Sequence, residues 1–256
     1  MKVVEDESLR IFVDQGLKEG RSPESIAGRL KHREKKRPYV SKEGIKTYLH
    51  SIYGRQIEAV RKKLFPYKKP RKKSAPKGTL DGRTFIEKRP RIADLRQRVG
   101  DVEADFIISG KQGRGILLVV ADRKTRVSFI ERILLPSIKN MERAFRKIKK
   151  RFPEMKTITT DNDLLFQHHL RLEAMLNVKI YFCNPYHSWE KGTIERTNKE
   201  IRRYIPKGSD ISFYPPSLVK RVEMKINDRW MKVLLSASPA ELLQKFRGRK
   251  KRLSGV

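Results

Sequence analysis

The chain has 256 residues and a net charge of +32, because 61 residues are Lys or Arg and only 29 are Asp or Glu. So large a positive charge indicates a polyanionic partner, which we take to be nucleic acid, although an RNA-binding protein of the ribosomal type would be equally basic. A single cysteine, Cys183, excludes an internal disulfide framework and a cysteine-based zinc site. No apolar run approaches the roughly 18 residues of a membrane span, so we expect a cytoplasmic protein without a membrane partner.

Hydrophobic residues make up 38% of the chain, enough for one sizeable core and a smaller helical unit. The smaller unit is predicted over residues 1–60, where two short helices have clear start signals. Ser22 can cap the first helix, with Pro23 at its first position and an apolar face following at helical spacing. Ser41 can cap the second helix. We therefore expect an all-α N-terminal domain.

The second of these helices, Ser41 to His50, presents Lys42 and Lys46 away from its apolar stripe. Two short capped helices are typical of a helix-turn-helix DNA-binding domain, in which the second helix enters the major groove. The alternative is a small helical bundle with a solvated basic face. The overall charge favours the first interpretation, with double-stranded DNA as the partner.

Residues 61–98 are mostly basic, are interrupted by prolines and show little periodicity, so we predict an extended basic linker. The densest cluster of positive charge in it can lie along DNA phosphates and gain affinity by counterion release without reading bases. A merely solvated linker is the alternative. A second basic run, residues 246–256, is predicted to form a tail. The phosphate contacts expected from the linker cluster are Lys68, Lys69, Arg71, Lys72 and Lys73.

From Gly100 the pattern changes to that of an α/β domain, which we place at residues 99–245. Apolar and acidic residues alternate from Asp101 to Ile108, the period-two pattern of a strand with one face toward a core. Two further strand-like runs, Ile116 to Ala121 and Val127 to Ile133, follow after short connections. Three neighbouring antiparallel strands are therefore predicted.

The rest of this domain alternates helices and strands. Helical periodicity runs from Pro136 to Phe152, and the strand Thr157 to Asp161 ends on an acid. A helix over Leu164 to Asn177, a strand over Val178 to Phe182 and a helix over Gly192 to Tyr204 complete the order. Three strands followed by helix, strand, helix, strand and helix is the order of an RNase H-like domain, in which a sheet carries helices on its faces.

Asp105 and Asp161 are acids on or directly after hydrophobic strands in a very basic chain. The two strands are neighbours in the predicted fold, so these carboxylates can meet at one edge of the sheet. Glu195 lies in the first turn of the helix that begins at Gly192. Carboxylates from separate elements can hold two divalent ions for cleavage or transfer of a phosphodiester, and Mg²⁺ prefers oxygen ligands. Taken singly, however, each of these acids is more often a turn, cap or first-turn residue.

Three blocks of sequence contain these acids: Val99 to Asp105, Thr159 to Asn162 and Ser188 to Asn198. They resemble the three catalytic blocks of the IS-thirty family of bacterial insertion-sequence transposases. Asp161 and Glu195 are separated by 33 residues, as the pattern of that family expects. The resemblance extends from about residue 8 to residue 245 and includes the two helix starts described above.

The family pattern also selects among neighbouring acids. It places the first acid of the triad at Asp105, the second at Asp161 and the third at Glu195. The rivals that it passes over are Asp101, Glu103, Asp163 and Glu190.

The resemblance implies a DDE transposase, a polynucleotidyl transferase with an integrase-type catalytic core. Asp105 and Asp161 would hold divalent metal, with Glu195 completing a second site, so that two Mg²⁺ or Mn²⁺ ions are expected. Water would nick the 3′ end of the element, and the freed 3′-hydroxyl would attack another phosphodiester in line without a covalent protein–DNA intermediate. The implied partners are the element's terminal inverted repeats, target DNA and further copies of the chain that pair two ends, at the bacterial nucleoid.

Basic side chains around the glutamate are candidates for phosphate contacts, although a charged helix face is usually only solvated. His187 and Trp189, in the loop before that helix, can position a flanking nucleotide or simply pack. Two other functions remain open: a DNA-binding regulator without catalysis, which the intact acids argue against, and an RNase H-class nuclease without strand transfer, which the same triad permits. The basic candidates are Lys191, Lys199, Arg202 and Arg203.

Overall fold

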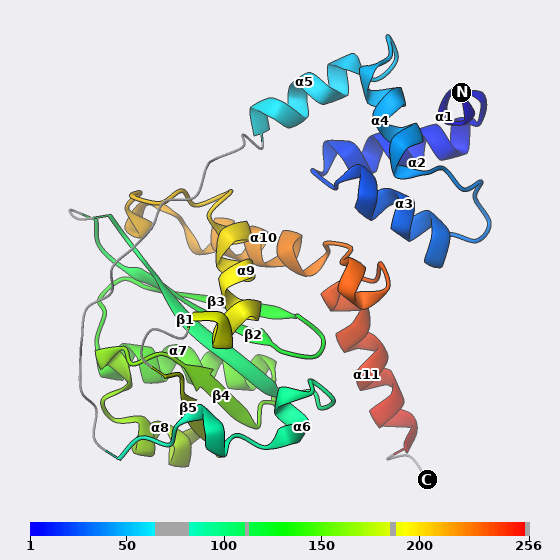
Figure 1. Cartoon of the computed structure of the whole chain (residues 1–256). Coiled ribbons are helices and arrows are strands. Elements are labelled where there is room, and N and C mark those ends of the chain that lie inside the picture. The colour runs from blue at the N-terminus through cyan, green and yellow to red at the C-terminus, as the bar shows by residue number, and fades with distance from the viewer. Residues whose placement is uncertain (65–81, 111–112, 185–187, 254–256) are drawn as a thin grey trace. The chain divides into compact units, whose positions relative to one another are not determined.

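The computed structural model describes residues 1–64, 82–110, 113–184 and 188–253. The chain divides into two compact units (Figure 1). The helical unit contains Met1–Ser74 and Asp228–Val256, and the sheet unit is Ala75–Asn227. No described helix combines the length and the apolar character that a membrane crossing demands.

The helical unit begins with five helices. The two helix starts expected at serines are confirmed, because the Ser22 hydroxyl accepts a hydrogen bond from the backbone N–H of Ser25, and Ser41 does the same for Gly44. Such caps satisfy amide groups that the first helical turn leaves without partners. The helices are α1 (Lys2–Glu5), α2 (Glu7–Lys18), α3 (Pro23–His32), α4 (Lys42–His50) and α5 (Arg55–Leu64).

The C-terminal segment completes the helical unit with η5 (Lys232–Leu234) and α11 (Pro239–Leu253). The ring of Trp230 stacks on that of Phe12 at 5.5 Å, and the guanidinium of Arg21 lies 3.7 Å from the Trp230 ring centroid. This differs from the expected catalytic domain, which extended to residue 245, and from the expected tail, most of which is helical. The segment packs here because Trp230 adds to the core formed by the N-terminal helices.

The sheet unit contains a five-stranded sheet in the order β3-β2-β1-β4-β5. The first three strands along the chain pair antiparallel, as predicted, while β1 pairs parallel with β4 and β4 with β5. The strand that carries Asp105 is therefore central, and the strand that ends before Asp161 is its neighbour. This topology confirms the predicted α/β, RNase H-like class. The strands are β1 (Asp101–Ile108), β2 (Ile116–Asp122), β3 (Ser128–Ile133), β4 (Thr157–Thr160) and β5 (Lys179–Phe182).

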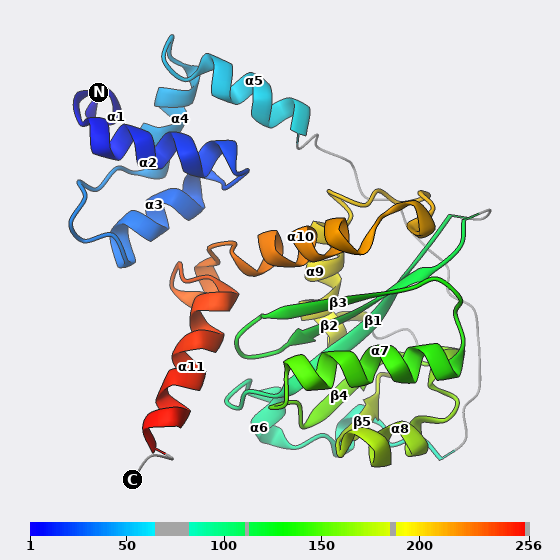
Figure 2. The same ribbon diagram turned by 180° about the vertical axis from the view of Figure 1, so that it is seen from behind.

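Helices cover both faces of this sheet. Figures 1 and 2 show α9 (Gly192–Ile201) on one face and α7 (Ile138–Arg151) on the other. α10 (Pro216–Asn227) shares an apolar core with α9, whereas α8 (His169–Leu176) contacts α7. The sequence predicted that only one face of β1 packs against a core. This prediction was wrong for the first residues of the strand, because Asp101 and Glu103 are fully buried.

Glu103 joins the sheet to the first turn of α9. Its Oε1 accepts a hydrogen bond from Nη1 of Arg123 at 2.5 Å, and its Oε2 accepts one from the backbone N–H of Ile194 at 2.8 Å. Arg123, in the turn after β2, is itself 5% exposed. An ionised buried carboxylate needs such partners because it has lost its hydration. The Glu103 carboxylate thus fixes where α9 begins over β1.

The expected linker, residues 61–98, is not extended throughout. Residues 82–98 belong to the sheet unit and contain η1 (Ile86–Lys88) and α6 (Arg91–Asp94). The side chain of Arg89 donates to Oγ1 of Thr159 at 3.0 Å, and Ala93 is fully buried. Two such contacts are too few to give the segment a periodic pattern of apolar residues, so the sequence did not indicate that it packs on the sheet unit. The basic cluster between residues 68 and 73 lies outside the described residues.

Replacing Arg123 with Met is expected to lower the free energy of unfolding by about 3–5 kcal/mol, because Glu103 would remain buried without its charged partner. Chemical denaturation followed by fluorescence measures this change. Arg143→Met, at an exposed position of α7, is the matched control and should change stability by less than about 0.5 kcal/mol. Equal effects of the two substitutions would contradict a structural role for the Arg123–Glu103 pair.

The thiol of Cys183 provides a second check on the sheet unit. Cys183 follows β5 and is 3% exposed, and burial raises the pKa of its thiol to about 12. Because the thiolate is the reactive form, iodoacetamide at pH 8 should label the native protein much more slowly than protein unfolded in guanidinium chloride. Mass spectrometry over a time course measures both rates, and similar rates would mean that Cys183 is accessible in the folded chain.

Candidate active site

Two carboxylates from neighbouring strands converge on one ammonium group. Asp105 lies on β1 and Asp161 directly follows β4. Nζ of Lys191 is 3.0 Å from Oδ2 of Asp161 and 3.5 Å from Oδ1 of Asp105. The parallel pairing of β1 with β4 brings the two acids to one place, as the sequence predicted.

Lys191 reaches these acids from η3 (Ser188–Lys191), immediately before α9, and only 6% of the residue is exposed. Burial by itself lowers the pKa of this ammonium group, but the charges of Asp105 and Asp161 outweigh burial and hold the pKa above its ordinary value. Lys191 therefore stays charged at neutral pH.

The Asp105 carboxyl group is held from two sides. Its Oδ2 accepts a hydrogen bond from Nδ2 of Asn198 at 2.7 Å, and its Oδ1 faces Lys191. Burial raises the pKa of Asp105, Lys191 opposes this rise, and the nearby charge of Asp161 adds to it. A cation at this position accordingly favours the ionised form of Asp105.

Glu195 lies on the same helix as Asn198, three residues earlier, and is half-buried. Residues three apart are neighbours on one helical face, so Glu195 is on the side of α9 from which Asn198 reaches Asp105. The Glu195 carboxylate nevertheless does not join the pair: within the described ranges, no three His, Cys, Asp or Glu side chains lie close enough to hold a metal ion. The structure brings two of the three predicted acids together and places the third on the adjoining helix.

The rival acids have other contacts. Glu103 holds the start of α9, and Asp101 accepts hydrogen bonds from Arg98 at 2.7 Å and from Thr157 at 2.8 Å. The remaining two bind backbone amides: Asp163 accepts from the N–H of Leu165 at 2.9 Å, and Glu190 accepts from that of Asn184 at 3.0 Å.

The donor atoms at the carboxylate pair suit a hard divalent cation. Oδ1 of Asp161 and Oδ1 of Asn198 are buried and have no hydrogen-bond partner. Buried polar oxygens without partners are rare because each loses its hydration without compensation. Asp105, Asp161 and Asn198 thus offer oxygen atoms, the type of ligand that Mg²⁺ and Mn²⁺ prefer.

The predicted DNA contacts have different surroundings. On α4, Lys46 is exposed and Lys42 lies 3.6 Å from Glu43. On and after α9, Lys199 is exposed, while Arg202 donates to the backbone oxygens of Ile108 and Pro206. Lys191 is engaged by the two aspartates, and Arg203 pairs with Glu200 at 3.0 Å. His187 and the side chain of Trp189 lie outside the described part of the chain, as do Lys68, Lys69, Arg71, Lys72 and Lys73.

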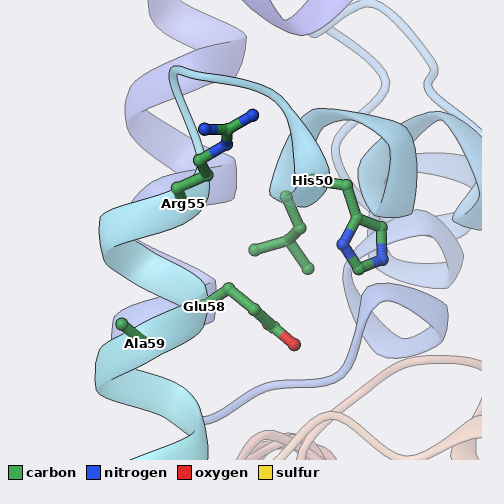
Figure 3. Close-up of a pocket in the computed structure, with 5 residues that line it drawn as sticks. His50, Arg55, Glu58 and Ala59 are labelled. Carbon is green, nitrogen blue, oxygen red and sulfur yellow. The ribbon is translucent and has the colours of Figure 1, made fainter.

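Figure 3 shows a hollow in the helical unit, between α4 and α5. His50, Arg55 and Glu58 line it together with Leu49 and Ala59. Glu58 is paired with Arg61 at 3.0 Å, so its charge is already matched. None of the predicted catalytic acids contributes to this hollow.

Two residues of the site have roles that the sequence did not predict. The sequence predicts a phosphate contact for Lys191, and it includes Asn198 only as the last residue of a catalytic block. The spacing of three residues between Glu195 and Asn198 is the signal that indicates a shared helical face. No local pattern predicts the contact of Lys191, because its partners lie on two distant strands.

Comparison with known proteins identifies transposases as relatives. The chain is 37% identical over 249 residues to the transposase for insertion sequence element IS4351 of Bacteroides fragilis, covering 91% of this chain and 72% of that protein. It is 29% identical over 250 residues to the transposase InsI for insertion sequence element IS30A of Escherichia coli (strain K12), covering 93% of this chain and 64% of that protein.

Among solved structures, the catalytic core domain of BIV integrase matches 59% of this chain and 98% of its own, with a TM-score of 0.47 and 13% identity. No protein-family model matches the chain. Because the identity to curated transposases extends over about nine tenths of the sequence, the chain belongs to the IS-thirty family of bacterial insertion-sequence transposases.

Proposed function

We propose that this transposase nicks the ends of its element and joins them to target DNA with Asp105, Asp161 and Glu195 as the catalytic triad. The observation that carries the proposal is the pair of aspartates on neighbouring strands, whose oxygens lie 3.0 and 3.5 Å from a single buried ammonium. Two carboxylates that already bind the ammonium cation of Lys191 can also bind a metal cation. Members of this family are DNA transposases and polynucleotidyl transferases, which makes a phosphodiester the substrate.

The residues present fit divalent metal, and we propose that two Mg²⁺ or Mn²⁺ ions are used. Asp105 and Asp161 would hold the first, and Glu195, on the same face of α9 as Asn198, would complete the second. Such ions activate water and stabilise the attacking and leaving oxygens of an in-line displacement. Asn198 orients the Asp105 carboxylate, and Glu103 holds the helix that carries Glu195.

The proposed reaction consists of one hydrolysis and one transesterification, and neither step needs an external energy source. Water attacks a phosphodiester at the end of the element, and the leaving group is the 3′-hydroxyl of the cut strand. That hydroxyl then attacks a phosphodiester of the target, so one bond forms as one breaks. No side chain has to serve as the nucleophile, so no covalent protein–DNA intermediate is proposed.

Double-stranded DNA is the proposed partner of both units. The helical unit, with Lys42 and Lys46 on α4, would bind terminal inverted repeats in the manner of a helix-turn-helix, and Lys199 would contact phosphate beside the triad. Pairing of two ends requires at least two copies of the chain, so we propose a homo-oligomer that works at the nucleoid in the cytoplasm.

Replacing Asp105 or Asp161 with Asn, or Glu195 with Gln, should reduce both nicking and strand transfer by about a thousandfold or more, since the ions supply several kcal/mol of transition-state stabilisation. Gel assays on terminal-repeat DNA with Mg²⁺ measure both products. Glu200→Gln, on the same helix, is the matched control and should retain activity. Wild-type rates in Glu195→Gln protein would remove Glu195 from the triad, and hydrolysis without transfer products would favour a nuclease.

Replacing Lys46 with Gln should weaken binding of terminal-repeat DNA and reduce the dependence of log K on log salt by roughly one for each phosphate that the protein no longer neutralises. Fluorescence anisotropy at several salt concentrations measures this slope. Lys18→Gln removes an exposed charge from the same unit, in the last turn of α2, and is the control. If the affinity of the two variants fell equally, α4 would not be the DNA-contacting helix.

A further inference from the structure

We propose that Lys191 is a built-in counter-cation of the carboxylate pair, and that a divalent ion enters the active site only by displacing its ammonium group. This inference rests on the proposed function, because it assumes that Asp105 and Asp161 bind metal. It assigns Lys191 a role as a positioning residue that competes with the metal.

The ammonium already contacts both carboxylates that are proposed to hold metal. Nζ of Lys191 is 3.0 Å from Oδ2 of Asp161 and 3.5 Å from Oδ1 of Asp105, so one positive charge serves both acids. A divalent ion bound to the same carboxylates would bring further positive charge close to the ammonium, and the two cations would repel each other strongly.

The ammonium also explains how two half-buried carboxylates can lie together before metal is bound. The side chains of Asp105 and Asp161 are 23% and 49% exposed, and the charge of Asp161 helps to raise the pKa of Asp105. Lys191 supplies one positive charge to this pair, and Asn198 donates a hydrogen bond to Asp105 from the other side. The pair is thereby held in position in the absence of metal.

The local backbone allows Lys191 to leave. Lys191 is at the N-cap position of α9, where its side chain makes no capping hydrogen bond. Gly192, which follows it, is exposed, and a Cβ atom added there would contact no other atom. The lysine side chain has four rotatable bonds, so its ammonium can swing toward solvent while α9 remains fixed through Glu103. Once released, the ammonium is free to pair with a phosphate, the contact that the sequence predicted for it.

The first test measures Mn²⁺ binding by isothermal titration calorimetry. Lys191→Met should bind Mn²⁺ about tenfold more tightly than the wild type, or more, because no ammonium has to be displaced. Arg196→Met removes an exposed charge from the same helix and should leave the affinity nearly unchanged. Equal or weaker binding by Lys191→Met would overturn the inference.

Asp161→Asn separates failure of this inference from failure of the proposed function. If Asp161→Asn abolishes Mn²⁺ binding while Lys191→Met leaves it unchanged, the metal site stands and the competition by Lys191 is rejected. If Asp161→Asn leaves binding intact, the ion binds elsewhere, and the proposed metal site and this inference both fail.

A second measurement uses the wild-type protein and so does not depend on a variant that folds. Acetic anhydride labels free lysine amines, and mass spectrometry measures the extent at each lysine. Lys191 should be protected in metal-free protein and labelled severalfold faster at saturating Mn²⁺, whereas Lys199, exposed on α9, should react at similar rates in both. Labelling of Lys191 that does not change with Mn²⁺ would overturn the inference.

Discussion

The buried carboxylate of Glu103 is the contact on which the geometry of the active site depends. It belongs to the central strand, binds Arg123 from the following turn and accepts the backbone N–H of Ile194 in the first turn of α9. One side chain therefore ties three elements together in the interior of the unit. Burying a charge in this way is costly, and the cost is offset only while both partners stay in place. Because the Glu103 carboxylate needs both partners, the first turn of α9 is held in one position over β1.

Several features of the active site follow from that anchored helix. Lys191 precedes it, Glu195 lies in its first turn, and Asn198 reaches Asp105 from its second. The sheet contributes the two aspartates: Asp105 is paired with β2 inside the sheet, and Asp161 directly follows β4. The helix and the residue before it contribute Asn198 and Lys191, which contact those aspartates, and Glu195. Two carboxylates on the sheet and a third on the helix beside it are the arrangement that the proposed metal site requires.

The sequence predicted the order of strands and helices in the sheet unit, because runs such as Ile116 to Ala121 have strong local patterns. It also predicted that Asp105 and Asp161 would lie close together, whereas the third predicted acid, Glu195, does not join them. It did not predict that Glu103 is structural, since alternation along β1 shows only that a residue shares a face with Asp105. The packing of Trp230 on Phe12 was missed for a related reason. Contacts between residues more than 200 positions apart leave no periodic signal in either segment.

The helical unit contains both the N-terminal helices and the C-terminal segment, so during synthesis it can be completed only after the sheet unit. The ribosome makes Phe12, Arg21 and Arg29 first and Trp230 only after the entire sheet unit has been translated. The sheet unit also needs α9 and α10 for its core, and both are translated before Trp230, so this unit can fold before the helical unit is complete. A chain released before residue 230 would have a finished sheet but a helical unit lacking its tryptophan. Translation of this late segment is thus the step that completes the core of the N-terminal helices.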